Sequence, residues 1–295
     1  MNTRNLQQLS KGAGDFRTIF VPHKKNAMIV SLDFSAQELR IIADYSQDPN
    51  MLSCYTGEHR KDMHSLTAAG IAKMDYETFK SIIDDESHAQ HKWAKDIRKL
   101  AKTVNFGSEY GAQAPKMAQT LMVTEEEAQR YLDAKSQAFS RSEKWKEEVI
   151  TEAHRLGYST TMLGVRRHLP NLNSSNKWDV IKAERQAVNF KVQGSGAEMT
   201  KLAMARMWQA GIRQKYDLRF LAPIHDEVVF SISIEDMPQA ICEIHEAMTA
   251  PYANMRVPIE SSISFGWNFN DQHEVGDIGK PTPELIQQHI QNYMR

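Results

Sequence analysis

The chain has 295 residues, of which 41% are hydrophobic and 25% charged, as is ordinary for a soluble globular protein. Its 36 Lys and Arg and 37 Asp and Glu give a net charge of −1, which neither indicates nor excludes nucleic acid, because a local basic groove can coexist with an acidic surface. Two cysteines, Cys54 and Cys242, allow neither a disulfide framework nor a zinc-ligand cluster. No apolar run approaches the length of about 18 residues that is needed to cross a bilayer. We therefore predict a cytoplasmic protein with no membrane partner.

The first predicted element is a short buried strand at 27–34 that carries Asp33 near its end. The following Ser35-Ala36-Gln37-Glu38 has the Ser-x-x-Glu form of a capping box, which predicts that a helix begins there. This order places the carboxylate of Asp33 at a sheet edge, where metal ions are commonly held. The alternatives are a strand-end or helix-capping aspartate at 33 and a purely capping role for Glu38.

A long helical region is predicted at 62–158, and the helix expected at about 87–104 leads into an unusual face. At every fourth position this face carries Arg98, Lys102, Phe106 and Tyr110. Residues four apart stack on one side of a helix, so two cations are followed by an aromatic ring and a phenol. This pattern suits a ligand with a polyphosphate and a base, such as a nucleoside triphosphate. The alternative is a basic surface helix with two half-buried aromatic residues.

Three further signals divide the helical region. Asp62-Met63-His64-Ser65 opens it, and a lone His at position 64 is more often an ordinary surface or core residue. Thr124-Glu125-Glu126-Glu127 is a second capping box and predicts a helix to about Phe139. A helix at about 141–156 is expected to stop at Gly157. The charged runs on these helices are interpreted as solvated faces without chemistry.

A hairpin-like piece is predicted at 158–172, and its basic strand carries Arg166 and Arg167. This strand is suited to phosphate contact but is equally plausible as ordinary surface. The next helix, at about 177–191, leads through polar residues at four-residue spacing, namely Arg185, Asn189 and Gln193. Polar side chains in this arrangement could bond base edges in a minor groove without selecting a sequence. A solvated helix face is the alternative.

The C-terminal part predicts a mixed sheet packed with helices. Ser195-x-x-Glu198 is expected to cap a helix to about Lys215. Strand-like runs at 218–224 and 228–234 flank His225-Asp226-Glu227, and three ionisable residues at a hairpin tip are costly unless something positive meets them. Taken alone, a polar turn is the commoner explanation. The remaining elements are a helix at 237–248, a strand at 257–265 and a helix from 283. The fold class predicted is α+β.

Three of these stretches together resemble the motifs of the family A DNA polymerases, the bacterial DNA polymerase I type. Asp33-Phe34-Ser35-x-x-Glu38-Leu39-Arg40 is similar to the family's Asp-Tyr-Ser-x-x-Glu-Leu-Arg, although Ala36-Gln37 replaces the usual Gln-Ile. The stretch from Arg98 to Gly111 is similar to the nucleotide-binding motif, and His225-Asp226-Glu227 to the third motif. Further matches are Asp62-x-His64, Glu184-Arg185-x-x-x-Asn189-x-x-x-Gln193 and Phe265-Gly266-Trp267. Asn5-Leu6-Gln7 also resembles the segment that leads into the first motif, so the resemblance spans roughly residues 5–270.

The resemblance implies template-directed DNA synthesis, in which deoxynucleotides are added to a primer 3′-hydroxyl by phosphoryl transfer and pyrophosphate is released. Asp33 and Asp226, with the backbone carbonyl of Phe34, would hold two Mg²⁺ ions roughly 4 Å apart. One ion would lower the pKa of the 3′-hydroxyl and the other would neutralise the pyrophosphate. Glu227 is counted as catalytic with the two aspartates, because it would support the metal site.

The resemblance also assigns residues to the nucleotide and to the DNA. The nucleotide-binding residues are Glu38, His64, Arg98, Lys102, Phe106 and Tyr110. Glu38 would lie against the sugar and exclude a 2′-hydroxyl, and a Phe at position 106 implies discrimination against dideoxynucleotides. The DNA-binding residues are Arg40, Arg166, Arg167, Arg185, Asn189, Gln193 and His225.

The implied architecture is a right-hand palm with a mixed, mainly antiparallel sheet and a helical fingers domain. We expect the palm in 1–45 and 176–295 and the fingers in 46–175. The family's thumb and exonuclease domains do not fit before Asp33, so we expect half of a split, phage-type polymerase or a fragment. Its partner would be a separate thumb or exonuclease polypeptide, and a viral protein would act in the host cytoplasm. Without such a partner, we expect this chain to bind DNA weakly and in a salt-sensitive way.

Two alternatives stay open. The first is a non-catalytic or partner-dependent nucleic-acid-binding subunit that has kept the fold, although intact Asp33, Asp226, Arg98 and Lys102 argue against decay. The second is a single-subunit RNA polymerase, which Glu38 and Phe106 disfavour.

Overall fold

The computed structural model describes residues 14–109, 111–276 and 279–295. Within these ranges the chain divides into two compact units, one made of the described residues up to Glu38 with Gln193–Arg295, and the other of Leu39–Val192. The domain boundaries expected from the sequence, at 45/46 and 175/176, differ from this division. The assignment of those ranges to palm and fingers stays a prediction. No helix in the described part of the chain is long and apolar enough to span a membrane.

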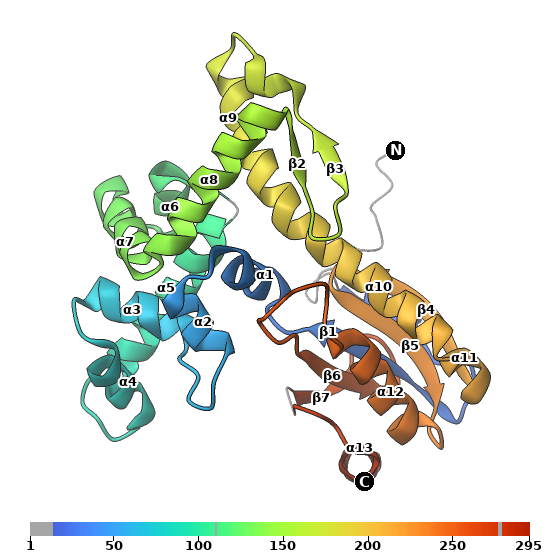
Figure 1. Ribbon diagram of the computed structural model, residues 1–295. Helices are drawn as coiled ribbons and strands as arrows, with labels where there is room; N and C mark the ends of the chain where they lie inside the picture. The colour runs from blue at the N-terminus through green and yellow to red at the C-terminus, as the bar shows by residue number, and fades with distance from the viewer. Residues whose placement is uncertain (1–13, 110, 277–278) are drawn as a thin grey trace. The chain divides into compact units, whose positions relative to one another are not determined.

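The first unit is built on a five-stranded sheet in the order β4-β5-β1-β6-β7, and all of its ladders are antiparallel (Figure 1). Its strands are β1 (Ala27–Phe34), β4 (Leu218–Ile224), β5 (Glu227–Ser233), β6 (Ser261–Gly266) and β7 (Gln272–Gly276). The apolar β1 therefore lies in the middle of the sheet, between β5 and β6, as its composition predicts.

Helices cover one face of this sheet. In Figure 1, α10 (Ser195–Gln209), α11 (Ile212–Lys215) and α12 (Met237–Thr249) lie in front of the strands, and α12 packs on α13 (Pro283–Met294). Side chains alternate along a strand, so the side of β1 that faces the helices includes Phe34, whose ring meets Tyr252 edge-on at 6.4 Å between centroids. Asp33 therefore belongs to the opposite face.

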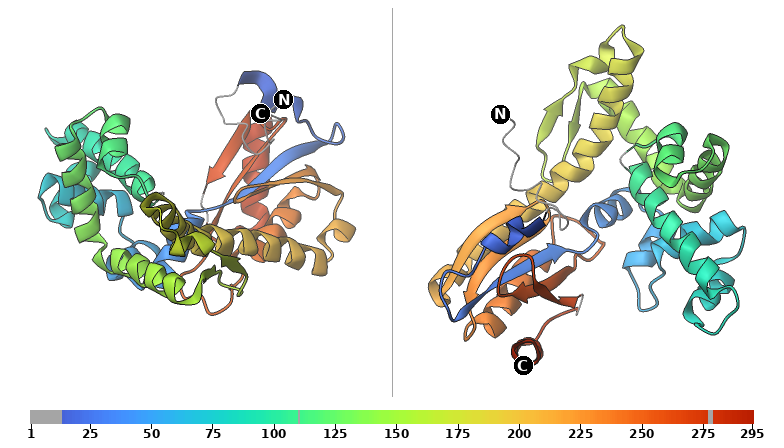
Figure 2. Two further views of the ribbon diagram at one scale, coloured as in Figure 1. Left: turned by 90° about the horizontal axis from the view of Figure 1, so that it is seen from above. Right: turned by 180° about the vertical axis from the view of Figure 1, so that it is seen from behind.

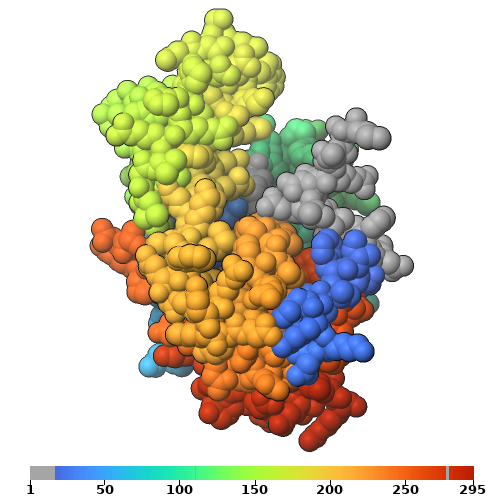
Figure 3. Space-filling model, turned by 90° about the vertical axis from the view of Figure 1, so that its right-hand side faces the viewer, coloured from blue at the N-terminus to red at the C-terminus, as the bar shows by residue number. Residues whose placement is uncertain are grey.

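The opposite face carries the start of the described chain. The 3₁₀ helix η2 (Gly14–Ile19) lies on this side in both views of Figure 2, and residues 14–26 run beside the β4–β5 hairpin in Figure 3 (blue beside orange). The backbone N–H of His23 donates to Ser231 Oγ at 3.0 Å, which fixes the segment on β5. An apolar cluster on this face consists of Phe20, Ile29, Ile224, Val229 and Phe269.

The second unit is helical except for a two-stranded hairpin. Its helices are α1 (Gln37–Ser46, which begins in the first unit), α2 (Pro49–Tyr55), α3 (Met63–Ala72), α4 (Tyr76–Asp84), α5 (His91–Glu109), α6 (Ala114–Leu121), α7 (Glu125–Ala138), α8 (Ser140–Leu156) and α9 (Lys177–Asn189). The hairpin is formed by β2 (Tyr158–Thr160) and β3 (Arg166–His168), followed by the 3₁₀ helix η3 (Pro170–Asn173). The long α5 is central, because α3, α4, α6 and α7 all pack against it.

The predicted helix signals are confirmed at two places and wrong at a third. Thr124 and Glu127 form a reciprocal capping box with both bonds at 3.2 Å, and α8 ends at Gly157 with φ +77°. The expected capping box at Ser195 does not begin a new helix. Instead α9 continues through a π-helical turn, η4 (Phe190–Gly194), directly into α10, whose preceding residue Gly194 is itself helical and provides no side-chain cap. Turns of this kind often mark functional sites.

A positive φ at Ala36 gives the first testable prediction. Ala36 is exposed and has φ +52°, a left-handed conformation that costs an L-residue about 1 kcal/mol or more. We expect Ala36→Gly to raise the free energy of unfolding by about 0.5–1 kcal/mol, since glycine adopts this conformation freely. Urea denaturation measures the effect. The matched control is Ala197→Gly, an exposed position within α10, where the same change should destabilise; equal effects at both positions would contradict the argument.

Candidate active site

Carboxylates from two strands meet at one edge of the first unit's sheet. In the β1–β5 ladder Asp33 lies directly opposite Glu227, and the backbone N–H of Phe34 donates to the carbonyl of Asp226 at 3.2 Å. The loop between β4 and β5 is only two residues long, because Ile224 pairs with Glu227. A two-residue loop holds its side chains close to the strand ends. The structure therefore brings Asp33 together with the adjacent pair Asp226 and Glu227, which lies far from it in sequence.

These carboxylates are partly exposed to solvent, although Asp33 Oδ1 is itself buried. The side chains at opposed positions of an antiparallel ladder share a face, so Asp33 and Glu227 are on the face away from α12, and Asp33, Asp226 and Glu227 are all half-buried. His225 at the hairpin tip is exposed and has φ +57°. Backbone strain of this kind at a non-glycine residue is concentrated at functional sites.

The oxygen atoms at this edge supply only part of a metal coordination shell, as is usual for Mg²⁺ sites in proteins. Among the described residues there is no group of three or more His, Cys, Asp or Glu side chains arranged to hold a metal ion unaided. Mg²⁺ usually takes one or two carboxylates and completes its shell with water and substrate phosphates. Asp33 and Asp226, with the carbonyl of Phe34 beside them, offer this kind of incomplete set.

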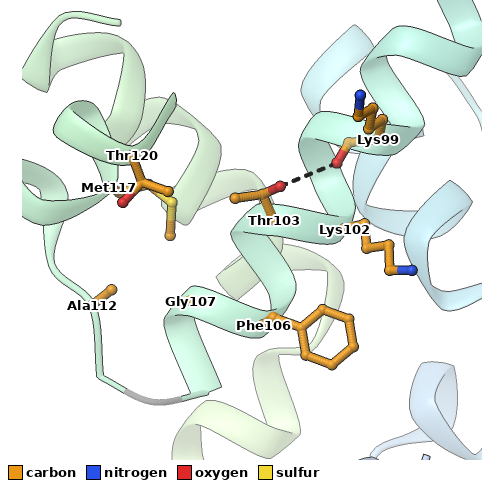
Figure 4. A pocket seen from close by; sticks show the side chains of 8 residues that line it. All are labelled: Lys99, Lys102, Thr103, Phe106, Gly107, Ala112, Met117 and Thr120. Carbon is orange, nitrogen blue, oxygen red and sulfur yellow. Dashed lines mark hydrogen bonds between the residues drawn. The ribbon is translucent and has the colours of Figure 1, made fainter. Parts of the chain in front are cut away.

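The predicted nucleotide face is found on α5 in the second unit. Arg98 and Lys102 follow each other along the helix, and the Lys102 ammonium lies 6.0 Å from the centroid of the Phe106 ring, which is 44% exposed. Figure 4 shows Lys102 and Phe106 on one side of α5 and Thr103 on the side toward Met117. The helix extends to Glu109, past the predicted end at about 104. Tyr110, the fourth member of the face, lies outside the described residues.

Arg98 and the backbone of His64 are both held by Asp62, to which the sequence assigned no role of its own. Arg98 Nε donates to Asp62 Oδ2 at 2.5 Å, and the other oxygen of Asp62 accepts from the backbone N–H of His64 and so caps α3. Burial alone would raise the pKa of the Asp62 carboxyl, but the hydrogen bonds from Arg98 and Ser65 hold it below its usual value. One guanidinium donor is thus committed to Asp62.

His64 lies beside the Phe106 ring, with 5.8 Å between their centroids. Its Nδ1 is 3.1 Å from Asn105 Nδ2, and Thr67 Oγ1 donates to Asn105 Oδ1 at 2.8 Å, so α3 and α5 are joined by a buried polar chain. Burial lowers the pKa of His64, and the charges of Arg98 and Lys102 lower it further against the opposing effect of Asp62. His64 is therefore neutral at pH 7, and Asn105 is a site residue that its position between apolar neighbours did not reveal.

A pocket of about 530 Å³ opens between α5 and α6 (Figure 4). Its lining residues are Lys99, Lys102, Thr103, Phe106, Gly107, Ala112, Met117 and Thr120. The two helices approach closely at Gly107, where a Cβ would lie 2.6 Å from the Met117 methyl carbon. The volume lies in the range of small-molecule sites, which is about 300–1,000 Å³. The pocket thus extends the face of Lys102 and Phe106 into a concave surface.

The candidate DNA contacts fall into accessible and inaccessible groups. Arg166 and Arg167 are exposed on β3, with their guanidinium carbons 4.9 Å from the Tyr158 ring and 5.8 Å from the Phe190 ring. Arg185 on α9 and Gln193 in the π-helical turn are exposed, and Asn189 between them is half-buried. The π turn contains one residue more than an α-helical turn, so Gln193 does not lie on the same helix face that four-residue spacing would give in a regular α-helix.

Arg40 is placed differently from the other predicted DNA contacts. It is only 4% exposed, and its guanidinium lies over the ring of Tyr55 at 4.8 Å. A buried arginine on an aromatic ring supports packing inside the helical unit. Glu38, in the first turn of α1, is half-buried at the end of the first unit.

Comparison with known proteins identifies the family. The sequence model of the family described as DNA polymerase family A matches residues 1–271. The chain belongs to this family. The match ends just before β7, so this strand and α13 follow the family A region.

Family A relatives are similar over most of this chain. DNA polymerase I of Bacillus caldotenax is 28% identical over 270 residues, which cover 92% of this chain and 29% of the relative. The thermostable DNA polymerase I of Thermus aquaticus is 30% identical over 239 residues, covering 81% of this chain and 26% of the relative. The chain therefore spans just over a quarter of the length of these curated relatives.

A solved structure supports the predicted fold class. The POL domain of Pol1 from M. smegmatis, in complex with DNA primer-template and dNTP, matches with a TM-score of 0.76 and 29% identity. The match covers 90% of this chain and 45% of that one. The prediction of an α+β fold with a palm sheet and helical fingers is thus confirmed.

Proposed function

We propose that this chain carries the catalytic part of a family A DNA polymerase and adds deoxynucleotides to a primer 3′-hydroxyl, with release of pyrophosphate. The observation that carries the proposal is the convergence of Asp33, Asp226 and Glu227 at the β1–β5 edge, on the face away from the helices. Membership of family A supports the same activity. The primer-template and dNTP in the M. smegmatis complex suggest the corresponding partners here.

Asp33 and Asp226 would hold Mg²⁺ through their carboxylates, with the carbonyl of Phe34 as a further ligand. Bound there, the ions would activate the 3′-hydroxyl and offset the charge of the leaving pyrophosphate in a two-metal phosphoryl transfer. Glu227, directly opposite Asp33, adds negative charge that favours cation binding. His225 at the exposed hairpin tip would contact the primer terminus.

The nucleotide would be bound by α5 and α3. Arg98 and Lys102 would contact the triphosphate, and the bond from Arg98 Nε to Asp62 leaves the two terminal nitrogens of the fork for phosphate oxygens. The neutral ring of His64 would provide a hydrogen bond to the same phosphates. The half-exposed ring of Phe106 would stack on the base, and Tyr110 would lie near the templating position.

The sugar and the duplex would be read by separate residues. Glu38 would lie against the sugar and favour deoxynucleotides. Arg166 and Arg167 would contact phosphates, while Arg185, Asn189 and Gln193 would check base pairs from the minor groove. Arg40, being buried over Tyr55, would act through packing instead of direct DNA contact. The thumbless, split and viral character expected above stays a prediction.

Primer extension tests the proposal directly. With a recessed DNA duplex, four deoxynucleotides and Mg²⁺, we expect the chain to extend the primer, and chelation of the metal to abolish extension, because the incomplete carboxylate set needs the ion. Ribonucleotides are the control substrate and should be used at least about tenfold less well. Extension that persists with excess chelator would contradict the metal mechanism. A chain that binds duplex tightly but extends no primer would favour the non-catalytic alternative.

A further inference from the structure

Four charged side chains from three helices form a largely buried cluster at the end of α5. Lys135 Nζ of α7 lies 2.7 Å from Glu109 Oε1, the last residue of α5, and also contacts Glu143 of α8. Lys146 Nζ of α8 lies 3.0 Å from Glu109 Oε2 and 3.1 Å from Glu143 Oε1. The side chains of Lys135 and Glu109 are only 1% and 6% exposed. The expectation that the charged runs of this region are solvated is therefore wrong here.

The cluster pairs two carboxylates with two ammonium groups, so its formal charges balance. Burial would raise the pKa of the Glu109 carboxyl, but Lys135 and Lys146 lower it by more, and the net pKa lies below the usual value. Burial would likewise lower the pKa of Lys135, but Glu109 and Glu143 raise it overall. The two oxygens of Glu109 are buried, and the charges of Lys135 and Lys146 lower the pKa of this carboxyl more than their hydrogen bonds do.

Stability alone does not explain this choice of residues. Replacing a buried ion pair by apolar residues of similar volume is often neutral or stabilising, because desolvation offsets the attraction. Apolar packing is available nearby, since α5, α6 and α7 share a core of Val104, Met117, Ala118 and Ala128. A Glu at the last position of a helix is also disfavoured by the helix dipole. A buried charge network does, however, define one geometry more narrowly than apolar contacts.

The cluster lies within one turn of the candidate nucleotide residues. Phe106 precedes Glu109 by three residues, and Asn105, which contacts His64, precedes it by four. Past the helix, Gly111 has φ +76° and lies against Arg185, where a Cβ would be 3.4 Å from Arg185 Cδ. Whatever fixes Glu109 thus fixes the rotation of the turn that presents Phe106.

We propose that Glu109, Lys135 and Lys146 are positioning residues that set the end of α5 and, through it, the Phe106 ring that receives the incoming base. This role rests on the proposed function of α5 as the nucleotide-binding helix. It predicts that breaking the cluster raises the KM for the nucleotide more than it lowers the rate of the chemical step. The reason is that Asp33 and Asp226 belong to the first unit, whereas the cluster belongs to the second.

The kinetic test compares three variants of the full chain in primer extension. Glu109→Gln keeps the shape but removes the charge, and we expect it to raise the KM for deoxynucleotides about tenfold with less than a threefold change in kcat. The double variant Glu109→Leu/Lys135→Leu leaves Lys146 paired with Glu143. We expect its melting temperature to match that of the unsubstituted chain, while its KM for deoxynucleotides stays raised. Glu148→Gln removes a half-exposed partner of Arg141 on α8 and is the matched control, with no change in KM.

Hydrogen exchange separates this role from the proposed function. We expect the amides of residues 104–109 to exchange about tenfold faster in Glu109→Gln than in the unsubstituted chain or Glu148→Gln, while β1 is unaffected. Unchanged exchange at 104–109, or a double variant that regains KM together with the melting temperature, would overturn the positioning role. If the unsubstituted chain extends no primer, the proposed function fails, while the exchange result still decides whether Glu109 fixes the end of α5.

Discussion

Replacing Asp33 or Asp226 by asparagine is expected to reduce primer extension by about 10³-fold or more while the fold is kept. Each aspartate would provide a charged oxygen ligand, and metal stabilisation of transition-state charge contributes several kcal/mol, with about 1.4 kcal/mol for each factor of ten in rate. Asparagine has nearly the same shape as aspartate but no charge. The hydrogen bond from the backbone N–H of Phe34 to the backbone carbonyl of residue 226 can therefore remain. Single-turnover extension at saturating deoxynucleotide measures the chemical step.

The control lies on the other side of the same sheet. Glu246 is an exposed residue of α12, which covers the face away from Asp33, and Glu246→Gln should extend primers at the normal rate. All three variants should show the same circular dichroism and nearly the same melting temperature. If either Asp33→Asn or Asp226→Asn kept more than a tenth of the normal rate, the assignment of the site to the β1–β5 edge would be wrong.

The strands that carry the carboxylates could be predicted, because the signal for each strand lies in a short continuous stretch of sequence. The apolar run at 27–34 and the runs flanking His225-Asp226-Glu227 have few other solutions than strands joined by a tight turn, and both were found within a residue of the expected bounds. Their pairing follows from burying β1 in the sheet. The resemblance to family A added what spacing alone could not, namely that Asp33 and Asp226 belong to one site.

Features that depend on tertiary contacts could not be predicted in this way. Charges on the helices of the second unit resemble solvated faces in sequence, yet Lys135 is 1% exposed because Glu109 and Glu143 surround it from two other helices. The π-helical turn at 190–194 has no local signature, and β7 has too little apolar alternation to be recognised. The motif assigns Arg40 to DNA, but its side chain is buried and lies over the ring of Tyr55, which no local pattern indicates.

Asp48 shows how a residue of no catalytic interest can support this scaffold. In the structure its carboxylate is 1% exposed and caps two helices at once. Oδ1 accepts from the backbone N–H groups of Asn50 and Met51 at 2.9 and 3.1 Å, at the start of α2. Oδ2 accepts from those of Arg141 and Ser142 at 3.0 and 3.1 Å, at the start of α8.

Asp48→Ala is therefore expected to lower the free energy of unfolding by about 3–4 kcal/mol, since it removes two caps and leaves four N–H groups without this acceptor in a buried place. Asp48→Asn keeps one acceptor oxygen and should cost about half as much. Asp75 is the matched control, because its exposed carboxylate caps α4 through the N–H of Thr78 at 2.9 Å, and Asp75→Ala should destabilise the protein much less than Asp48→Ala. Urea denaturation followed by circular dichroism measures all three, and equal losses for the alanine variants at 48 and 75 would show that the double cap does not link α2 to α8 energetically.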